Sequence, residues 1–67
     1  MVKLTSIKHE SGNKAYITAF ADTQEDVTSS MTVEGLPEGT EIAYGSSIIT
    51  AKAEVAFLKS DGTWNWV

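Results

Sequence analysis

The chain has 67 residues, of which 42% are apolar and 21% are charged, and it contains no cysteine. A chain of this length forms one domain, residues 1–67, and buries only about 60% of the surface that its unfolded form exposes. The absence of cysteine excludes disulfides. It also excludes a closed zinc site of thiolates and imidazoles, because His9 is the one histidine. Stability must therefore come from an efficient core or from contacts between copies of the chain.

The net charge of −4 argues against nucleic-acid binding, since the five lysines are scattered and there is no arginine. No stretch approaches the roughly 20 apolar residues that span a bilayer, and the N-terminal residues lack the apolar centre of a signal peptide. We therefore expect a protein that is made in the cytoplasm and has neither a nucleic-acid nor a membrane partner.

Two strands are expected at the N-terminus, over residues 3–8 and 16–21. The stretch between them is rich in residues that tolerate positive φ, which is typical of a hairpin. The second segment is apolar or small on both of its faces, with Ile17, Ala19 and Ala21 on one of them, and this pattern suits a central strand.

Two registers are compatible with this hairpin. A loop of three residues pairs Ile7 with Ile17 and Leu4 with Phe20, whereas a loop of two residues would place Lys8 opposite Ile17. We favour the three-residue loop, because it brings apolar side chains together across the strands.

The middle of the chain carries the clearest period of two. Apolar and polar residues alternate from residue 27 to residue 34, which predicts a strand with one buried and one wet face. That strand must end near Gly35, since Pro37 follows. The polar stretch before it, residues 23–26, predicts a loop or a single helical turn.

The last third contains several short apolar runs that end at turn residues. A short strand ending at Gly45 is expected, and Asp61-Gly62 is the strongest hairpin signal of the sequence. The expected strands of this part cover residues 42–44, 47–50, 55–59 and 64–67. Five to seven short strands joined by tight turns predict an all-β protein, a single small antiparallel barrel or sandwich.

Catalysis has little support in the sequence. His9 stands beside the expected hairpin turn, and no serine is marked as its partner. The cluster of Asp22, Glu25 and Asp26 does not match the spacing of a calcium-binding loop. We therefore expect no enzyme, no catalytic residue, no metal site and no cofactor.

The two tryptophans are more informative, because Trp64 and Trp66 project from the same face of a strand. A two-residue turn places Lys59 opposite Trp64 and Phe57 opposite Trp66, so that the lysine can lie over an indole. A three-residue loop with a glycine bulge instead places Leu58 opposite Trp64. The candidate surface is formed by Phe57, Lys59, Trp64 and Trp66.

Two interpretations of this surface remain. The tryptophans can form the core, since each buries about 150 to 250 Å² of surface. Alternatively, they can form a platform for a sugar or a protein partner, because tryptophan is enriched at interaction hot spots. A surface for self-association would partly satisfy both interpretations.

Residues 45–66 resemble a pattern of small proteins encoded by tailed phages and prophages. In this chain the pattern reads Gly45-Ser46-Ser47-Ile48-Ile49-Thr50, then Glu54-Val55-Ala56-Phe57-Leu58, then Lys59-Ser60-Asp61-Gly62-Thr63-Trp64. The proteins it resembles are accessory virion components of the head-fibre or head-decoration type. The resemblance implies a small all-β fold that assembles as an oligomer.

The resemblance therefore implies a non-enzymatic structural protein that acts by protein–protein contact, in capsid decoration or fibre attachment. Its expected partners are further copies of itself and capsid or tail proteins, and its expected location is the virion. The alternative is a small carbohydrate- or peptide-binding module that uses Trp64 and Trp66 as a stacking platform.

Overall fold

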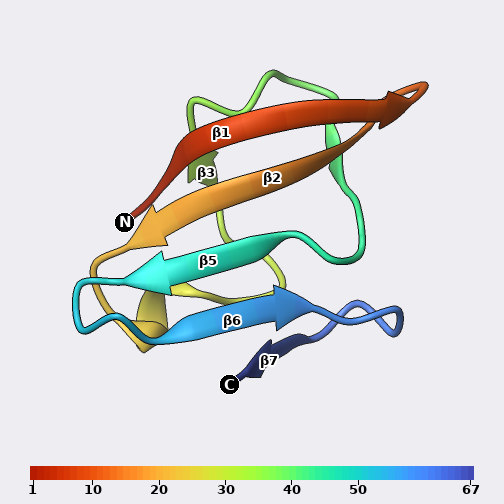
Figure 1. Ribbon diagram of the computed structural model, residues 1–67. Helices are drawn as coiled ribbons and strands as arrows, with labels where there is room; N and C mark the ends of the chain where they lie inside the picture. The colour runs from red at the N-terminus through yellow and green to blue at the C-terminus, as the bar shows by residue number, and fades with distance from the viewer.

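The computed structural model describes all 67 residues, which form one seven-stranded β-sheet and a single helical turn (Figure 1). The elements are β1 (Val2–Ser11), β2 (Lys14–Ala21), η1 (Gln24–Asp26), β3 (Val33–Glu34), β4 (Glu41–Ile42), β5 (Ser47–Thr50), β6 (Val55–Leu58) and β7 (Trp64–Trp66). The prediction of an all-β protein with five to seven short strands is confirmed. The structure contains no helix that is long and apolar enough to span a membrane.

The strand directions differ from the expected antiparallel arrangement. The hydrogen-bonded order is β3-β1-β2-β5-β6-β7, with β4 also paired to β2, and the sheet is not closed into a barrel. Three pairings are parallel: β1 with β3, β2 with β4, and β2 with β5. The reason is the long connection after β2, which crosses one face of the sheet before the chain rejoins it, as parallel pairing requires.

This connection, residues 22–40, covers one face of the sheet and is called the covering segment below. It runs behind the sheet in Figure 1 and places four side chains against the core. The covered side is the inner face and the other side is the outer face. The four side chains are those of Val27, Met31, Val33 and Leu36.

The central strand β2 shows the difference between the two faces most clearly. Ala15, Ile17, Ala19 and Ala21 are buried on the inner face, whereas the residues between them are exposed on the outer face. Strand β1 pairs with one edge of β2, and β4 and β5 pair with the other edge. The prediction of a central strand is therefore confirmed, although only one of its two faces is buried.

The strand predicted over residues 27–34 was wrong for most of its length. Only Val33 and Glu34 pair with a neighbour, along the edge of β1, and a turn forms where Met31 N–H donates to Thr28 O over 3.4 Å. The apolar positions still point toward the core, with the exception of Ser29. The alternation therefore reflects which side chains contact the core. Most of the covering segment lies across the sheet, where no neighbouring strand can form backbone hydrogen bonds with it.

The helical turn expected as one alternative for residues 23–26 is present as η1. Thr23 and Asp26 form a capping box around it, in which the side chain of each residue lies at the backbone of the other. The carboxylate of Asp26 also accepts a hydrogen bond of 2.6 Å from the N-terminal ammonium.

The N-terminal hairpin combines features of both predicted registers. Its loop has two residues, yet Ile7 does pair with Ile17, because a bulge near the loop shifts the strand by one position. A second bulge at Thr5 places Leu4 opposite Ala19, so the predicted pairing of Leu4 with Phe20 was wrong. Bulges absorb single extra residues in a strand. Here they keep Leu4 and Ile7 on the inner face with Val2.

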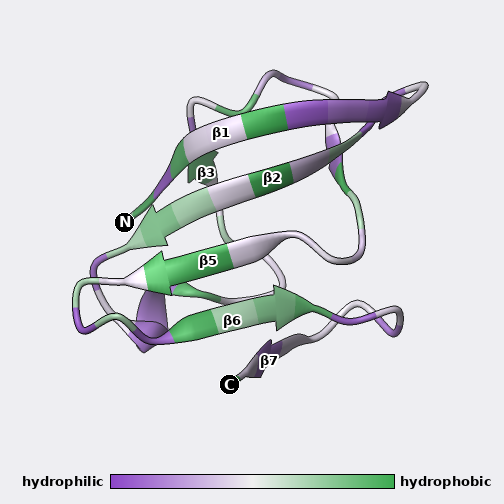
Figure 2. Cartoon of the chain, viewed as in Figure 1, coloured by the Kyte–Doolittle hydropathy of each residue, from purple (hydrophilic) through white to green (hydrophobic).

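The core is built mainly from small side chains. Nine apolar residues are buried, and five of them are alanines. The hydrophobic residues are concentrated in β5 and β6, whereas the tip of the β1–β2 hairpin is hydrophilic (Figure 2). None of the six aromatic side chains is among the buried residues. The large apolar surface of this chain therefore lies outside its own core.

Strands β4 and β5 follow the same edge of β2 but are interrupted between Ala43 and Ser46. Gly45 adopts a φ of +95°, which redirects the chain at this point. The buried Ser46 hydroxyl accepts a hydrogen bond of 3.0 Å from Ile17 N–H and donates one of 2.7 Å to Ala43 O. A side chain thus replaces the missing ladder contact, and the exposed Tyr44 projects from the interruption.

Candidate functional site

The C-terminal hairpin has the three-residue loop that was one of the two predicted alternatives. Leu58 pairs with Trp64, Ala56 pairs with Trp66, and Lys59 N–H donates to Thr63 O over 2.8 Å. The alternative with a two-residue turn was therefore wrong.

This register divides the four predicted candidate residues between the two faces of the sheet. Trp64 and Trp66 lie on the inner face with Ala56, whereas Phe57 pairs with Asn65 on the outer face. Strand alternation places Lys59 on the side of Phe57 as well, away from the indoles. Both tryptophans are partly buried, and Trp64 packs against the core. The predicted wall that joins Phe57 to the two tryptophans is therefore absent.

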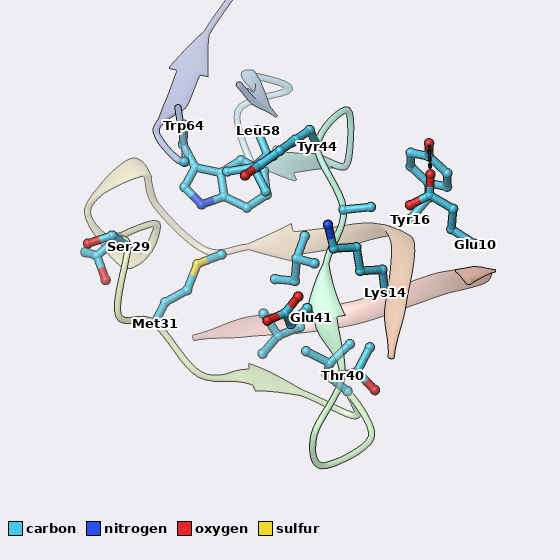
Figure 3. A pocket seen from close by; sticks show the side chains of 16 residues that line it. Glu10, Lys14, Tyr16, Ser29, Met31, Thr40, Glu41, Tyr44, Leu58 and Trp64 are labelled. Atoms are coloured by element: carbon cyan, nitrogen blue, oxygen red, sulfur yellow. Dashed lines mark hydrogen bonds between the residues drawn. The ribbon is translucent and has the colours of Figure 1, made fainter. Parts of the chain in front are cut away.

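Trp64 lines a cavity of about 590 Å³ between the covering segment, β4 and the C-terminal hairpin. We call it the aromatic cavity. Tyr44 from the β4–β5 interruption and Met31 from the covering segment also line it, and Figure 3 shows their side chains around the same space. Tyr44 is 54% exposed, so its ring is available at the mouth of the cavity.

Polar side chains surround these apolar groups. The ammonium of Lys14 lies 6.0 Å from the ring centroid of Tyr44, a cation–π distance. The side chains of Lys14, Thr40 and Glu41 all line the aromatic cavity, and none of them has a hydrogen-bond or ion-pair partner within the protein. Glu10 is engaged, because it accepts a hydrogen bond of 3.1 Å from the Tyr16 hydroxyl. That bond raises the pKa of Tyr16 above its ordinary value.

A second, smaller hollow of about 210 Å³ lies beside η1 and has only polar lining residues. Gln24 and Glu54 close it with a hydrogen bond of 2.7 Å. Nowhere in the 67 residues do three or more His, Cys, Asp or Glu side chains come together in a group that could hold a metal ion. The aromatic cavity is therefore the hollow that combines apolar walls with free polar groups.

The outer face is the other surface with unusual features. Cross-strand pairing places Phe20 of β2 beside Ile49 of β5, and Ile49 beside Val55 of β6. Tyr16, Phe20, Ile49 and Phe57 are between 37% and 44% exposed on this face. No segment of the chain lies in front of these strands in Figure 1. The outer face therefore presents an apolar strip across three strands.

Sequence reasoning missed Tyr44, because its role depends on the meeting of β4 with a hairpin 20 residues further along the chain. It also grouped Phe57 with the tryptophans, although one extra loop residue turns every side chain of a strand to the opposite face.

The loop that carries Trp64 gives a pH-dependent prediction. The Asp61 carboxylate accepts a hydrogen bond of 2.6 Å from the Thr63 hydroxyl and one of 3.0 Å from the Thr63 amide. These bonds, the hydroxyl's more than the amide's, lower the pKa of Asp61 below its ordinary 3.8. A lowered carboxyl pKa stabilises the folded state above the unfolded-state pKa and ceases to do so as the pH falls through the folded-state pKa. Asp61→Asn should therefore reduce the free energy of unfolding at pH 7 but not at pH 2.

Urea unfolding of both proteins across this range measures the effect, with Glu25→Gln as a control at an exposed carboxylate that has no ion-pair partner. A difference between wild type and Asp61→Asn that stays constant from pH 7 to pH 2 would contradict the assignment.

Comparison with protein families, with curated proteins and with solved structures finds no match to this chain. The class of this protein is therefore given by its structure: it is a small all-β protein whose mixed sheet is covered on one face.

Proposed function

We propose that the protein is a non-enzymatic accessory component of a phage or prophage virion that acts through protein–protein contact at its outer face. The observation that carries this proposal is that the small apolar residues form the core, whereas the large aromatic residues do not. Alanines make up most of the core, while none of the six aromatic side chains is buried.

A 67-residue domain without disulfides needs all the apolar burial that it can obtain. Burial contributes roughly 25 cal/mol for each Å² of apolar surface that leaves water. A strip containing Phe20, Ile49 and Phe57 therefore represents a large driving force that the isolated chain leaves unused. Exposed apolar patches of this kind mark contact sites in soluble proteins.

The occupant that we propose for the outer face is a second copy of the chain. The molecule measures 33 by 23 Å along its two longer axes, which bounds a face of roughly 750 Å², close to the ~800 Å² per partner of a standard interface. Two such faces can pack as aligned sheets about 10 Å apart. The dimer would then be a β-sandwich whose second sheet comes from the partner.

The charge distribution is compatible with a second copy. Six of the nine acidic residues lie in residues 22–41, in the covering segment and at the start of β4. By contrast, Lys3 and Lys8 flank the apolar strip on the outer-face side of β1, where they pair with Phe20 and Tyr16. Glu34 and Glu41 pair with Lys3 and Lys14 on neighbouring strands, so acidic residues at this face lie beside lysines when two copies meet.

Sedimentation equilibrium tests the contact. Wild-type protein should show an average mass above that of the 7.2 kDa monomer as its concentration rises toward about 1 mM. Phe57→Glu places a charge in the apolar strip and should weaken association by at least about tenfold. The control Thr32→Glu adds the same charge at an exposed residue of the covering segment, on the other side of the sheet, and should associate like wild type.

Ile49→Thr is a second test variant, because it keeps a β-branched side chain and so preserves strand propensity. Circular dichroism establishes that each variant is folded. Wild-type protein that remains monomeric up to about 1 mM would overturn the second copy as the occupant.

The virion part of the proposal rests on the resemblance of residues 45–66 to phage and prophage accessory proteins. It is tested by the neighbourhood of the coding gene. Portal, capsid or tail genes on both sides would support the proposal, whereas a neighbourhood of sugar-processing genes would contradict it.

A further inference from the structure

We propose that the aromatic cavity binds a saccharide of one or two rings. This inference goes beyond contact between proteins and rests on the aromatic cavity, which shares Tyr16 with the outer face. Its basis is the juxtaposition of two aromatic side chains, Trp64 and Tyr44, with unpaired polar groups of both hydrogen-bonding types.

The apolar part of the cavity suits the C–H faces of a pyranose ring. Aromatic rings carry a negative face, which attracts the weakly positive C–H groups of a sugar. The indole of Trp64 is supported by its packing against the core, whereas the ring of Tyr44 stands at the open side (Figure 3). The thioether of Met31 enters the same space from the covering segment.

The polar part of the cavity suits sugar hydroxyls, each of which donates and accepts. The ammonium of Lys14 can only donate, the carboxylate of Glu41 can only accept, and the hydroxyl of Thr40 can do both. These three groups have no partner in the protein, so their hydrogen-bonding capacity is free for a ligand. Ser29 and Thr28 add hydroxyls on the side of the covering segment.

Size and charge exclude other classes of ligand. A volume of about 590 Å³ lies within the range of small-molecule sites and corresponds to a short saccharide. Phosphate compounds are disfavoured, because Glu10 and Glu41 outnumber Lys14 in the lining and the chain is acidic overall. A purely apolar ligand would leave the polar groups dehydrated and unpaired.

The test is a titration of ¹⁵N-labelled full-length protein with glucose, maltose, cellobiose and chitobiose, followed by NMR. We expect at least one of these saccharides to shift the indole N–H signal of Trp64 with a dissociation constant of about 1 to 10 mM. The indole of Trp66 does not line the cavity and serves as the internal reference.

Two variants and one control locate the site. Tyr44→Ala and Glu41→Gln should each weaken binding by about tenfold or more, and neither removes a side-chain hydrogen bond from the folded protein. Glu38→Gln neutralises a carboxylate of the preceding loop that does not line the cavity, so it should bind like wild type.

Three results would overturn the assignment. They are the absence of a Trp64 response to every saccharide at about 50 mM, a response that persists unchanged in Tyr44→Ala, and a response to the peptide acetyl-Leu-Pro-Leu-amide alone. Because Tyr16 belongs to both the cavity and the outer face, the titration uses a protein concentration at which sedimentation shows a monomer.

Discussion

Replacement of Ile48 by alanine is expected to lower the free energy of unfolding by about 2 to 5 kcal/mol. Ile48 is fully buried and pairs with Ala19 on one side and Ala56 on the other. Its side chain therefore fills inner-face space that the small neighbours leave, and they cannot close the resulting cavity. A domain of this size has a total stability on the order of 3 to 10 kcal/mol, so the variant should be close to unfolding.

The adjacent residue provides the control. Ile49 is 44% exposed on the outer face, and Ile49→Ala should cost less than about 1 kcal/mol at a concentration where the protein is monomeric. Urea unfolding measures both variants, and Ile48→Val, with an expected loss of about 0.5 to 1.5 kcal/mol, covers the case in which Ile48→Ala does not fold. Equal losses for the two alanine variants would contradict the assignment of the faces.

Ser46→Ala is expected to cost about 1 to 3 kcal/mol, although it removes a single oxygen. The Ser46 hydroxyl is the acceptor for Ile17 N–H and donates to Ala43 O, and both of these residues are buried. Without the hydroxyl, Ile17 N–H has no partner where β4 and β5 are interrupted. An unpaired buried amide is costly, because it has lost its water and gained nothing in exchange.

Ser47→Ala is the matched control, since Ser47 has no side-chain hydrogen bond and is only partly buried. Hydrogen exchange adds a local measurement: the Ile17 amide should lose protection in Ser46→Ala relative to the Ala19 amide. Stability and Ile17 protection that match wild type would show that the hydroxyl does not hold the two strands to β2.

The Gly45-Ser46 pair shows which structural features a sequence pattern can predict and which it cannot. The phage-like pattern begins with this pair and a strand was expected over residues 47–50, where β5 is found. The physical reason is nonlocal, because Gly45 supplies a positive φ and Ser46 bonds to a strand 29 residues away. Its partner on β2 cannot be recognised from the sequence, since nothing near Ile17 marks it.

Strands whose signals are local could be predicted. The apolar or small residues on both faces of residues 16–21, and the turn residues around 47–50, 55–58 and 64–66, predict strands that are present as β2, β5, β6 and β7. Strand direction could not be predicted, because it depends on the route of the covering segment across the sheet. The alternation of apolar and polar residues over 27–34 belongs mostly to a loop, because burial of one side of a segment requires a core beside it but no partner strand.

The candidate surfaces were predicted only in part. Trp64 was identified by its size and spacing, but its neighbour Tyr44 in the aromatic cavity was not. Phe57 was identified as well, yet it lies on the outer face, because the loop at Asp61-Gly62 contains one residue more than the shorter alternative. A single loop residue therefore separates one continuous aromatic wall from two distinct surfaces.

The central claim is that the outer face is covered by a second copy of the chain. Hydroxyl-radical footprinting of the wild-type protein at about 5 µM and about 1 mM tests it directly, with oxidation of Phe20 and Phe57 followed by mass spectrometry. Both side chains should be oxidised at the lower concentration and protected at the higher one, while Trp66, which lies on the inner face, should be oxidised equally at both. Equal oxidation of Phe20 and Phe57 at the two concentrations would contradict the claim.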